Sequence, residues 1–389
     1  MRTELSIAFT GDIGFDKYMD RKWEDKELIS KEILDFLHSA DHVVANVEGP
    51  IIESVVSDAV SGVSQLRHSI DPAAVSVLQK IGADVWNICN NHIMDVGEEG
   101  LIATLTEAEN ANAITLGAGR NIKEASRPVY FDECGGVGLL AVGYDRACRA
   151  ADDEKCGCLN FRDMDIVKSA IEEIKSRCKY CIIVAHDGEE FTALPTSYTR
   201  NRYHKYLEFG ADIVVAHHPH VPMNYETAGD KIIFYSLGNF IFDTPYQRSQ
   251  KNTEKGILLK LIITEEKIDF VPFGIRIDRE NEHVVKDRLP DIFENVSKEE
   301  YELLAPLAAK MFIENTKRQV RYLNPGEYEN ASEEKWNENF SNPMRSGRVE
   351  GQLLDFAIVT ATAAKEKSGD WKKSTLKNVK KYMLEQIES

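Results

Sequence analysis

The sequence lacks any apolar run approaching the ~20 residues that a transmembrane helix needs, although 43% of its 389 residues are hydrophobic. We therefore expect no membrane span. The first residues, MRTELSIAFTGD, pass directly into a short strand-like segment, without the long apolar region and small-residue cleavage site of a signal peptide. The hydrophobic content suffices for a large core. These features predict a globular, cytoplasmic protein.

Positive charge is also in deficit. Lysine and arginine number 47 against 64 aspartates and glutamates, which gives a formal net charge of −17. Nucleic acids and anionic membrane surfaces are bound mainly through clustered positive charge. We therefore expect neither as a general partner.

Cysteine is scarce and irregularly spaced, with seven in the chain. An odd, irregular set in a chain of this size argues against a disulfide framework. Two short pairs, Cys156 with Cys158 and Cys178 with Cys181, could together form a zinc knuckle. Because Cys178 closes a predicted helix and Cys181 opens an apolar strand, reduced core thiols are the simpler interpretation. Reduced thiols agree with a cytoplasmic location.

Strand-like and helix-like segments alternate along most of the chain. Apolar spacing predicts helices over 25–41, 163–177 and 197–209. Asp71 as N-cap, Pro72 at the first helical position and Gly82 at the end predict another helix. From about residue 277 the chain becomes charged and helical, with helices expected near 350–366 and 371–387. We therefore predict an α/β domain over 1–276 and a helical extension over 277–389.

One pattern occurs twice. IGADVWNICNNH (81–92) and FGADIVVAHHPH (209–220) both run from the end of a helix through Gly-Ala-Asp and a strand to a polar cluster. In α/β folds, ligand sites lie beyond the carboxyl ends of the strands. We therefore examined which side chains each predicted strand delivers at its end.

The strand ends deliver carboxylates, amides and imidazoles. In chain order they are Asp12, Asn46, Glu48, Asn90, Asn91, His92, His186, Asp187, Glu189, His217, His218, His220, Ser236 and Asn239. This mixture suits Zn²⁺, Mn²⁺, Fe or Co better than Ca²⁺ or a thiolate zinc site. The sequence predicts one or two divalent ions, namely Mn, Fe or Zn.

Each candidate also has a simpler interpretation. Tandem asparagines occur in turns, a histidine can be a satisfied core residue, and acidic loop residues such as Asp187, Glu189 and Asp243 are common. The expected metal ligands are Asp12, Glu48, Asn91, His186, His218 and His220. His92 is the expected catalytic acid or a further ligand. Substrate contacts are expected from Arg67, Asn90, Arg120, His217 and Asn239, with arginine suited to clamp an anion.

The order of the motifs resembles the bacterial capsule-synthesis (CapA-type) family, also called poly-γ-glutamate biosynthesis proteins. The matching pieces span roughly residues 4–275 and are FTGDIG, NVEGP, NICNNHIMDVGEEGL, GAGRN, VAHDGEE, GADIVVAHHPHVP and FYSLGNFIFD. The resemblance implies a fold similar to calcineurin-like metallophosphoesterases, a four-layer αββα sandwich with metals at one end. Residues after about 277 match no family that we recognise.

The resemblance also implies residue roles. Asp12 stands in the place of the first-strand metal ligand, Glu48 in that of the bridging carboxylate, and His92 beside Asn91 in that of the catalytic acid. Asp12 and His92 are thus the implied catalytic residues, while the remaining implied ligands are His186, His218 and His220. Two departures are present. Gly14 stands where the phosphoesterases have a histidine, and Glu48 is one methylene longer than the aspartate it replaces.

The implied function is metal-dependent hydrolysis, in which a metal-activated hydroxide attacks a phosphoester or a γ-glutamyl amide and His92 protonates the leaving group. The substrate would be a small anionic molecule or a γ-glutamyl polymer. The alternative is a non-catalytic subunit of capsule or poly-γ-glutamate synthesis that binds an anionic polymer. Gly14 favours that alternative, whereas the missing membrane anchor disfavours it. Fold analogy alone does not decide between them.

Overall fold

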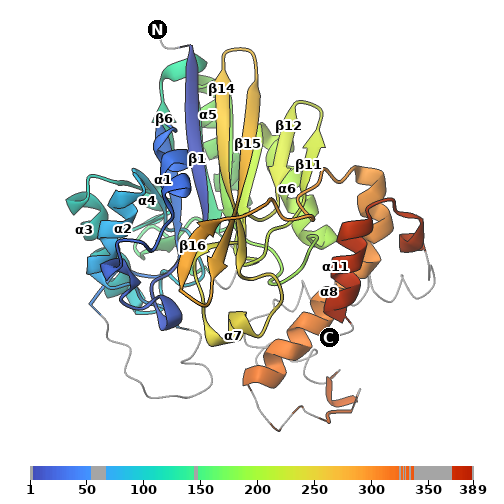
Figure 1. Ribbon diagram of the computed structural model, residues 1–389. Helices are drawn as coiled ribbons and strands as arrows, with labels where there is room; N and C mark the ends of the chain where they lie inside the picture. The colour runs from blue at the N-terminus through green and yellow to red at the C-terminus, as the bar shows by residue number, and fades with distance from the viewer. Residues whose placement is uncertain are drawn as a thin grey trace.

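Two β-sheets face each other in the computed structural model, and helices cover their outer faces (Figure 1). The described residues are 3–53, 67–143, 148–323, 326, 328, 330–332, 334–336 and 370–387. The largest hydrophobic core fills the space between the sheets and includes the fully buried Phe9, Trp86 and Phe234. The expected four-layer αββα arrangement is confirmed.

The first sheet has eight strands and is mixed. Its order is β16 (His283–Lys286), β15 (Ile268–Asp278), β14 (Lys255–Thr264), β1 (Glu4–Ile13), β2 (His42–Val47), β3 (Val85–Asn87) and β4 (Ile114–Leu116), with β13 (Asn239–Ile241) pairing the end of β1. Strands β1 to β4 are parallel, and β14 to β16 add an antiparallel edge.

The second sheet has six strands. Its order is β11 (Tyr225–Ala228), β12 (Lys231–Phe234), β10 (Ile213–His217), β9 (Tyr180–His186), β7 (Val137–Gly143) and β6 (Val129–Phe131). A small separate pair is formed by β5 (Ala118–Gly119) and β8 (Gly157–Cys158). Strands β7, β9, β10 and β12 are parallel, so their carboxyl ends point the same way.

The helices lie outside the two sheets. They are α1 (Lys31–His38), α2 (Val75–Lys80), α3 (Gly97–Asn110), α4 (Ile122–Ala125), α5 (Met164–Arg177), α6 (Ser197–Phe209), α7 (Pro245–Arg248), α8 (Lys298–Leu323) and α11 (Lys377–Ile387). Helix α5 contacts β7 and β9, and α6 contacts β10. The apolar stripe of α5 is buried, which is the pattern expected of a helix that covers a sheet.

Two predicted helices differ from their expected bounds. The helix expected over 25–41 is shorter, because Leu28 and Ser30 form backbone hydrogen bonds with Val284 of the edge strand β16 and α1 begins only at Lys31. The helix expected after Asp71 begins as a 3-10 turn. Its cap is confirmed, since the Asp71 side chain accepts a hydrogen bond from the backbone of Ala73 at 2.8 Å.

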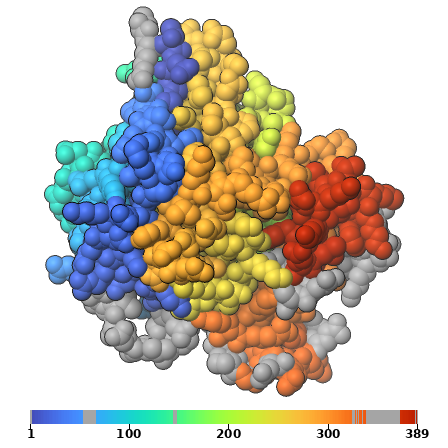
Figure 2. Space-filling view, in the orientation of Figure 1, coloured from blue at the N-terminus to red at the C-terminus, as the bar shows by residue number. Residues whose placement is uncertain are grey.

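The residues after 277 continue the first sheet before becoming helical. Strand β15 extends to Asp278 and β16 follows it, so the division at 277 stays a prediction. Helices α8 and α11 then pack on each other and on residues 193–194 through a second apolar cluster. Figure 2 shows α11, in red, on the opposite side of the molecule from the blue N-terminal segment. The helix expected near 350–366 lies outside the described residues.

All seven cysteines are buried and free, in the arrangement expected of core thiols. The groups that could hold a metal among the described residues contain no cysteine, so a zinc knuckle finds no support there. In that same part of the chain, no helix is both long and apolar enough to cross a membrane.

A buried ion pair joins the end of β9 to α6. The Arg202 Nε donates to Asp187 Oδ2 at 2.6 Å, and its guanidinium lies 4.0 Å from the ring centroid of Phe161. The Tyr203 hydroxyl donates to the Asp187 carbonyl at 3.0 Å. These contacts fix the chain immediately after His186, the last residue of β9.

We expect Arg202→Met to lower the free energy of unfolding by about 3–5 kcal/mol, because it removes the guanidinium that neutralises the buried Asp187 carboxylate. Urea unfolding followed by circular dichroism measures this change. Lys205→Met is the matched control on the same helix. Its exposed pair with Glu208 at 2.8 Å should contribute no more than about 1 kcal/mol. Equal losses in the two variants would contradict this account.

Candidate metal centre

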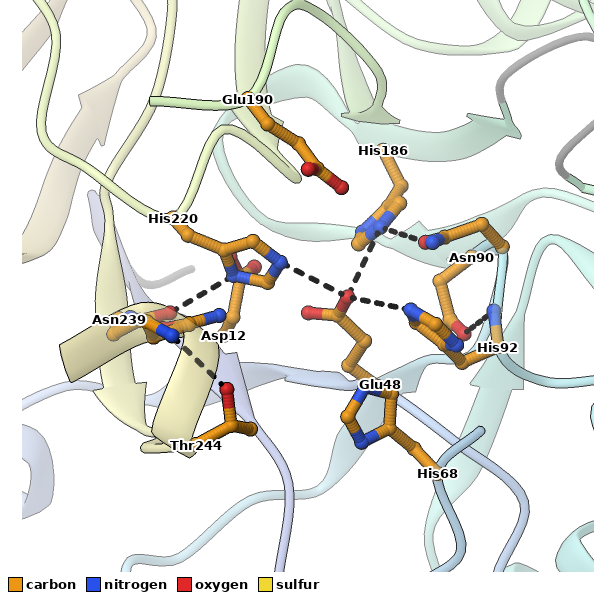
Figure 3. A network of polar contacts seen from close by, with 12 residues as sticks. Asp12, Glu48, His68, Asn90, His92, His186, Glu190, His220, Asn239 and Thr244 are labelled. Atoms are coloured by element: carbon orange, nitrogen blue, oxygen red, sulfur yellow. Dashed lines mark hydrogen bonds and ion pairs between the residues drawn. The ribbon is translucent and has the colours of Figure 1, made fainter. Parts of the chain in front are cut away.

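The parallel strands of both sheets end at one site (Figure 3). Asp12 lies at the end of β1, where it pairs with Asn46 of β2 and Asn239 of β13. In the second sheet, His186 of β9 and His217 of β10 lie side by side in register. Because side chains at strand ends project toward the same edge, two sheets facing each other bring both sets together.

The carboxylate of Glu48 lies at the centre of this site. Its Oε1 is 3.6 Å from His220 Nε2, 3.7 Å from His186 Nε2 and 3.8 Å from His92 Nε2. The residue is 0% exposed, and neither oxygen accepts a hydrogen bond from any residue that the structure describes. Burying an unsatisfied carboxylate is costly. The surrounding groups therefore fit a bound cation.

Two groups of buried side chains share Glu48. One consists of Glu48, His186 and His218, and the other of Asp12, Glu48 and His220; within each group the ligand atoms lie within 4.8 Å of one another. Imidazole nitrogen together with carboxylate oxygen is the donor set of a borderline divalent metal. If each group held an ion, Glu48 would be the ligand that the two ions share.

Asn91 belongs to the first group by position. Its Oδ1 lies 2.8 Å from His186 Nε2, so two expected ligand atoms already face each other. His218 and His220 flank Pro219 with φ values of +97° and +57°, in the region that costs non-glycine residues energy. Such strain at a functional site is consistent with holding both rings toward the centre.

Amide side chains support Asp12 and His220. Asn46 Nδ2 donates to Asp12 Oδ1 at 2.8 Å, and Asn87 Nδ2 donates to Asn46 Oδ1 at 2.7 Å. His220 Nδ1 lies 3.0 Å from Asn239 Oδ1 and 3.1 Å from Asp12 Oδ2. Such outer contacts orient metal-binding groups. Asn87 was not an expected site residue, although its position at a strand end was visible in the sequence.

His92 lies beside the two groups and is oriented by a carboxylate. Its Nδ1 is 2.7 Å from Asp95 Oδ2, and its Nε2 faces Glu48. Asp95 also accepts the backbone N–H of His68 at 2.8 Å. Burial alone would raise the pKa of Asp95, but His92 and the hydrogen bond from His68 outweigh it and lower that pKa. The pair is therefore built to hold the His92 ring in one orientation.

The surroundings shift the pKa values of the central groups. Burial raises the pKa of Glu48 well above its usual value, which His220 opposes and the charges of Asp12 and Glu190 reinforce. Burial, then the neighbouring His218 and other imidazoles, keeps the pKa of His186 well below its usual value. The His186 ring is thus neutral, as a metal ligand must be.

His220 differs from His186. Burial favours its neutral form, but Glu48 and Asp12 outweigh burial and raise the pKa of His220 to about 10. In the metal-free protein a proton on His220 therefore takes part of the place of a cation between the two carboxylates. Metal binding requires a deprotonated imidazole and would displace that proton.

Position 14 has no room for a side chain. A Cβ added at Gly14 would lie 2.7 Å from the ring atoms Cδ2 and Cε2 of Phe242. The Phe242 ring stacks on His220 with 4.8 Å between the ring centroids. The volume next to His220 on that side is therefore filled by a phenyl ring, so a side chain at position 14 would have to displace Phe242.

Three expected substrate contacts are exposed or make other contacts. Arg120 is exposed and pairs with Glu124 at 3.3 Å and with Glu109 at 3.6 Å, so its expected approach to the substrate is not supported. Arg67 is also exposed. His217 is buried with its Nε2 2.9 Å from the Thr10 carbonyl, which links the two sheets instead of facing a substrate.

The other two expected contacts are internal supports. Asn90 donates to the Val47 carbonyl at 2.7 Å and accepts from the His92 N–H at 3.1 Å. Asn239 is buried against His220. Asp243 is paired with Arg248 at 2.7 Å and Arg279 at 3.1 Å, in agreement with a structural role.

We expect Glu48→Gln to abolish stabilisation by Mn²⁺ without lowering the melting temperature measured in chelator, because a neutral amide costs less to bury than an unsatisfied carboxylate. In the wild type, Mn²⁺ at about 100 times its Kd should add about 2.7 kcal/mol of stability. Thermal melting with EDTA or Mn²⁺ measures both effects.

The matched control is Glu226→Gln. Glu226 is buried too, but it is paired with Arg200 through bonds of 2.8 Å and 2.5 Å. This variant should lower the melting temperature and keep the Mn²⁺ response. An undiminished Mn²⁺ response in Glu48→Gln would show that Glu48 is not a ligand.

The sequence is similar to those of several known proteins. Residues 6–244 match the family model described as "Bacterial capsule synthesis protein PGA_cap". The PGA biosynthesis protein CapA of Bacillus subtilis (strain 168) is 30% identical over 251 residues, which cover 63% of this chain and 65% of that protein. The capsule biosynthesis protein CapA of Bacillus anthracis is 27% identical over 255 residues, which cover 64% of this chain and 62% of that protein.

The chain thus spans less than two thirds of the length of either relative. A 5′-nucleotidase from Candida albicans is among the similar solved structures, with a TM-score of 0.41 and 12% identity, covering 71% of this chain and 52% of that one. Because the matched residues 6–244 make up more than half of the sequence, the chain belongs to the bacterial capsule synthesis protein PGA_cap family.

Proposed function

We propose that this protein is a metal-dependent hydrolase that acts on an anionic substrate, a phosphoester or a γ-glutamyl amide, in the synthesis of capsule or poly-γ-glutamate. The observation that carries the proposal is Glu48, a buried carboxylate without a hydrogen bond from the described residues, shared by two metal-capable groups. A purely structural role for Glu48 would require a partner for its charge within the protein. In a cation-binding role, the bound ion itself is that partner.

The residues would divide between two ions, either Mn, Fe or Zn. Asp12, Glu48 and His220 would hold one, while Glu48, His186 and His218 would hold the other together with Asn91. When bound, such ions polarise a substrate oxygen and lower the pKa of bound water toward neutrality. The chain itself supplies orientation, since Asn46 and Asn239 fix Asp12 and His220 in place.

His92 is the proposed general acid. Its Nδ1 is engaged by Asp95, which leaves Nε2 directed toward the centre, 3.8 Å from Glu48 Oε1. A proton held at Nε2 can pass to the leaving group, because that nitrogen faces the place where the substrate would react. Asp95 is a positioning residue, which keeps the ring from turning away.

The substrate class rests on the relatives. The Bacillus subtilis protein is named for poly-γ-glutamate (PGA) biosynthesis and the Bacillus anthracis protein for capsule biosynthesis. We extend this to the present chain as a proposal: the substrate is anionic, and the ions rather than arginine side chains bind its charge. Arg120 is already paired on the surface. The cytoplasmic location expected from the sequence also stays a proposal.

A second candidate is a non-catalytic subunit that binds an anionic polymer. The filled space at Gly14 favours it, because the group of Asp12, Glu48 and His220 lacks the histidine of the phosphoesterases. The cost of burying Glu48 weighs against a site that no longer binds metal. A hydrolysis assay separates the two.

We expect the metal-loaded protein to hydrolyse at least one member of a panel of aryl phosphomonoesters, aryl phosphodiesters and γ-glutamyl peptides with Mn²⁺, Fe²⁺ or Zn²⁺. His92→Ala should lower kcat by about 10²–10⁴-fold, the range for a general acid, and keep the metal content measured by mass spectrometry. His218→Ala should lose metal.

The matched control is His38→Ala, which removes an exposed histidine of α1. It should change neither turnover nor metal content. Binding of poly-γ-glutamate without turnover of any panel member would favour the non-catalytic candidate. Full metal and full activity in both His92→Ala and His218→Ala would refute the assignment.

A further inference from the structure

Glu190 was not among the expected ligands, yet it lies at the mouth of the metal centre. It follows Gly188 and Glu189 in the loop after β9 and is half-buried. Figure 3 shows its carboxylate directed toward the space between His186 and His220. The side chain is therefore oriented toward the groups that could hold metal.

The other acidic residue of the same loop has a different environment. Glu189 is buried and its carboxylate accepts hydrogen bonds from the Thr196 N–H at 2.9 Å, the Thr196 hydroxyl at 2.6 Å and the Thr199 hydroxyl at 2.8 Å. It is thus used to hold the loop to the start of α6. Of the two adjacent glutamates, only Glu190 is directed to the metal centre.

Helix α8, which follows the residues that match the family model, holds Glu190 in place. Gln319 Nε2 donates to Glu190 Oε2 at 3.0 Å. Asn315 Nδ2 donates to the Phe191 carbonyl at 2.8 Å and to the Glu190 carbonyl at 3.3 Å. The matched residues end at 244, so the C-terminal extension supplies these contacts. Side chain and backbone of Glu190 are both held.

The group of Asp12, Glu48 and His220 has room for a further ligand. Three protein ligands and a water complete a catalytic zinc site, whereas an octahedral manganese ion has positions for more. Phe242 blocks position 14 on one side of His220. Phe191, the neighbour of Glu190, stacks against His220 with 6.0 Å between ring centroids. The loop that carries Glu190 thus reaches the same imidazole.

We propose that Glu190 is the additional ligand of the ion held by Asp12, Glu48 and His220, and that Gln319 positions it. Gln319 engages Oε2, which leaves Oε1 to contact the ion. The glutamate thereby replaces the imidazole that Gly14 cannot provide, and the C-terminal extension becomes part of the metal centre. The proposal rests on the metal centre of the proposed function but not on hydrolysis.

The test is a titration of the chelator-stripped full chain with Mn²⁺, with free Mn²⁺ measured by electron paramagnetic resonance. We expect the wild type to bind two ions, one of which is lost in His220→Ala. Glu190→Gln should weaken binding of that ion by about tenfold or more, as loss of a ligand or its immediate support does, and leave the other unchanged. Gln319→Leu should weaken the same ion to a smaller extent.

Glu314→Gln is the matched control, since it removes the same charge from α8 where the side chain pairs with Lys317 at 3.2 Å. It should leave both affinities unchanged. Melting in EDTA checks that each variant is folded, and Glu190→Gln retains the size of the half-buried side chain.

Three outcomes would overturn the inference. Unchanged Mn²⁺ affinity in Glu190→Gln would exclude a ligand role, even if a substrate KM changed and so indicated a substrate contact. Equal weakening of both ions would indicate a general effect of charge. If the wild type binds no Mn²⁺ at all, the metal centre itself fails and the proposed function with it. If the wild type binds two Mn²⁺ ions and Glu190→Gln changes neither affinity, only this inference fails and the proposed function stands.

Discussion

The burial of the Glu48 carboxyl group, which raises its pKa well above the usual value, is the constraint on which the site depends. A carboxylate with no exposed surface and no hydrogen bond from the described residues is tolerated only where other charges compensate it. In the metal-free protein, His220 provides part of that compensation by retaining a proton at a pKa of about 10. The fold therefore gathers buried ligand groups whose charge a bound cation would balance. This favours a working metal site over a relic.

The topology explains why these ligand groups meet where they do. Parallel strands of two facing sheets end at the same edge, so residues from β1, β2, β9 and β10 meet although they are far apart in the chain. Hydrogen bonds from Asn87 to Asn46 and from Asn46 to Asp12 then link three adjacent strands and orient the Asp12 carboxylate. His217 ties the two sheets together through the Thr10 carbonyl. The site is thus rigid because it lies at the junction of both sheets.

The sequence predicted the part of the site that follows from strand ends. Asp12, Glu48, His186, His218 and His220 come together because each ends or follows a parallel strand, a pattern that local sequence reveals. The sequence did not reveal that the surface arginine Arg120 pairs with Glu109 of α3 and Glu124 of α4, and its substrate contact stays a prediction. The shortening of α1 likewise comes from a distant partner, Val284 of β16. Contacts at long range escape pattern-based prediction.

Contacts at long range also determine the surroundings of Gly14 and Glu190. These contacts change the interpretation of the histidine that is absent at position 14. From sequence alone, Gly14 indicates a ligand lost and hence a weakened site. In the structure, Phe242 occupies that space and stacks on His220, while Gln319, more than a hundred residues away in sequence, holds Glu190 toward the centre. The proposed role of Glu190 thus exchanges an imidazole ligand for a carboxylate ligand. A carboxylate neutralises the charge of a divalent ion more fully than an imidazole does. An anionic substrate would then meet a less positive centre, so we infer that the exchange affects substrate affinity as well as metal affinity.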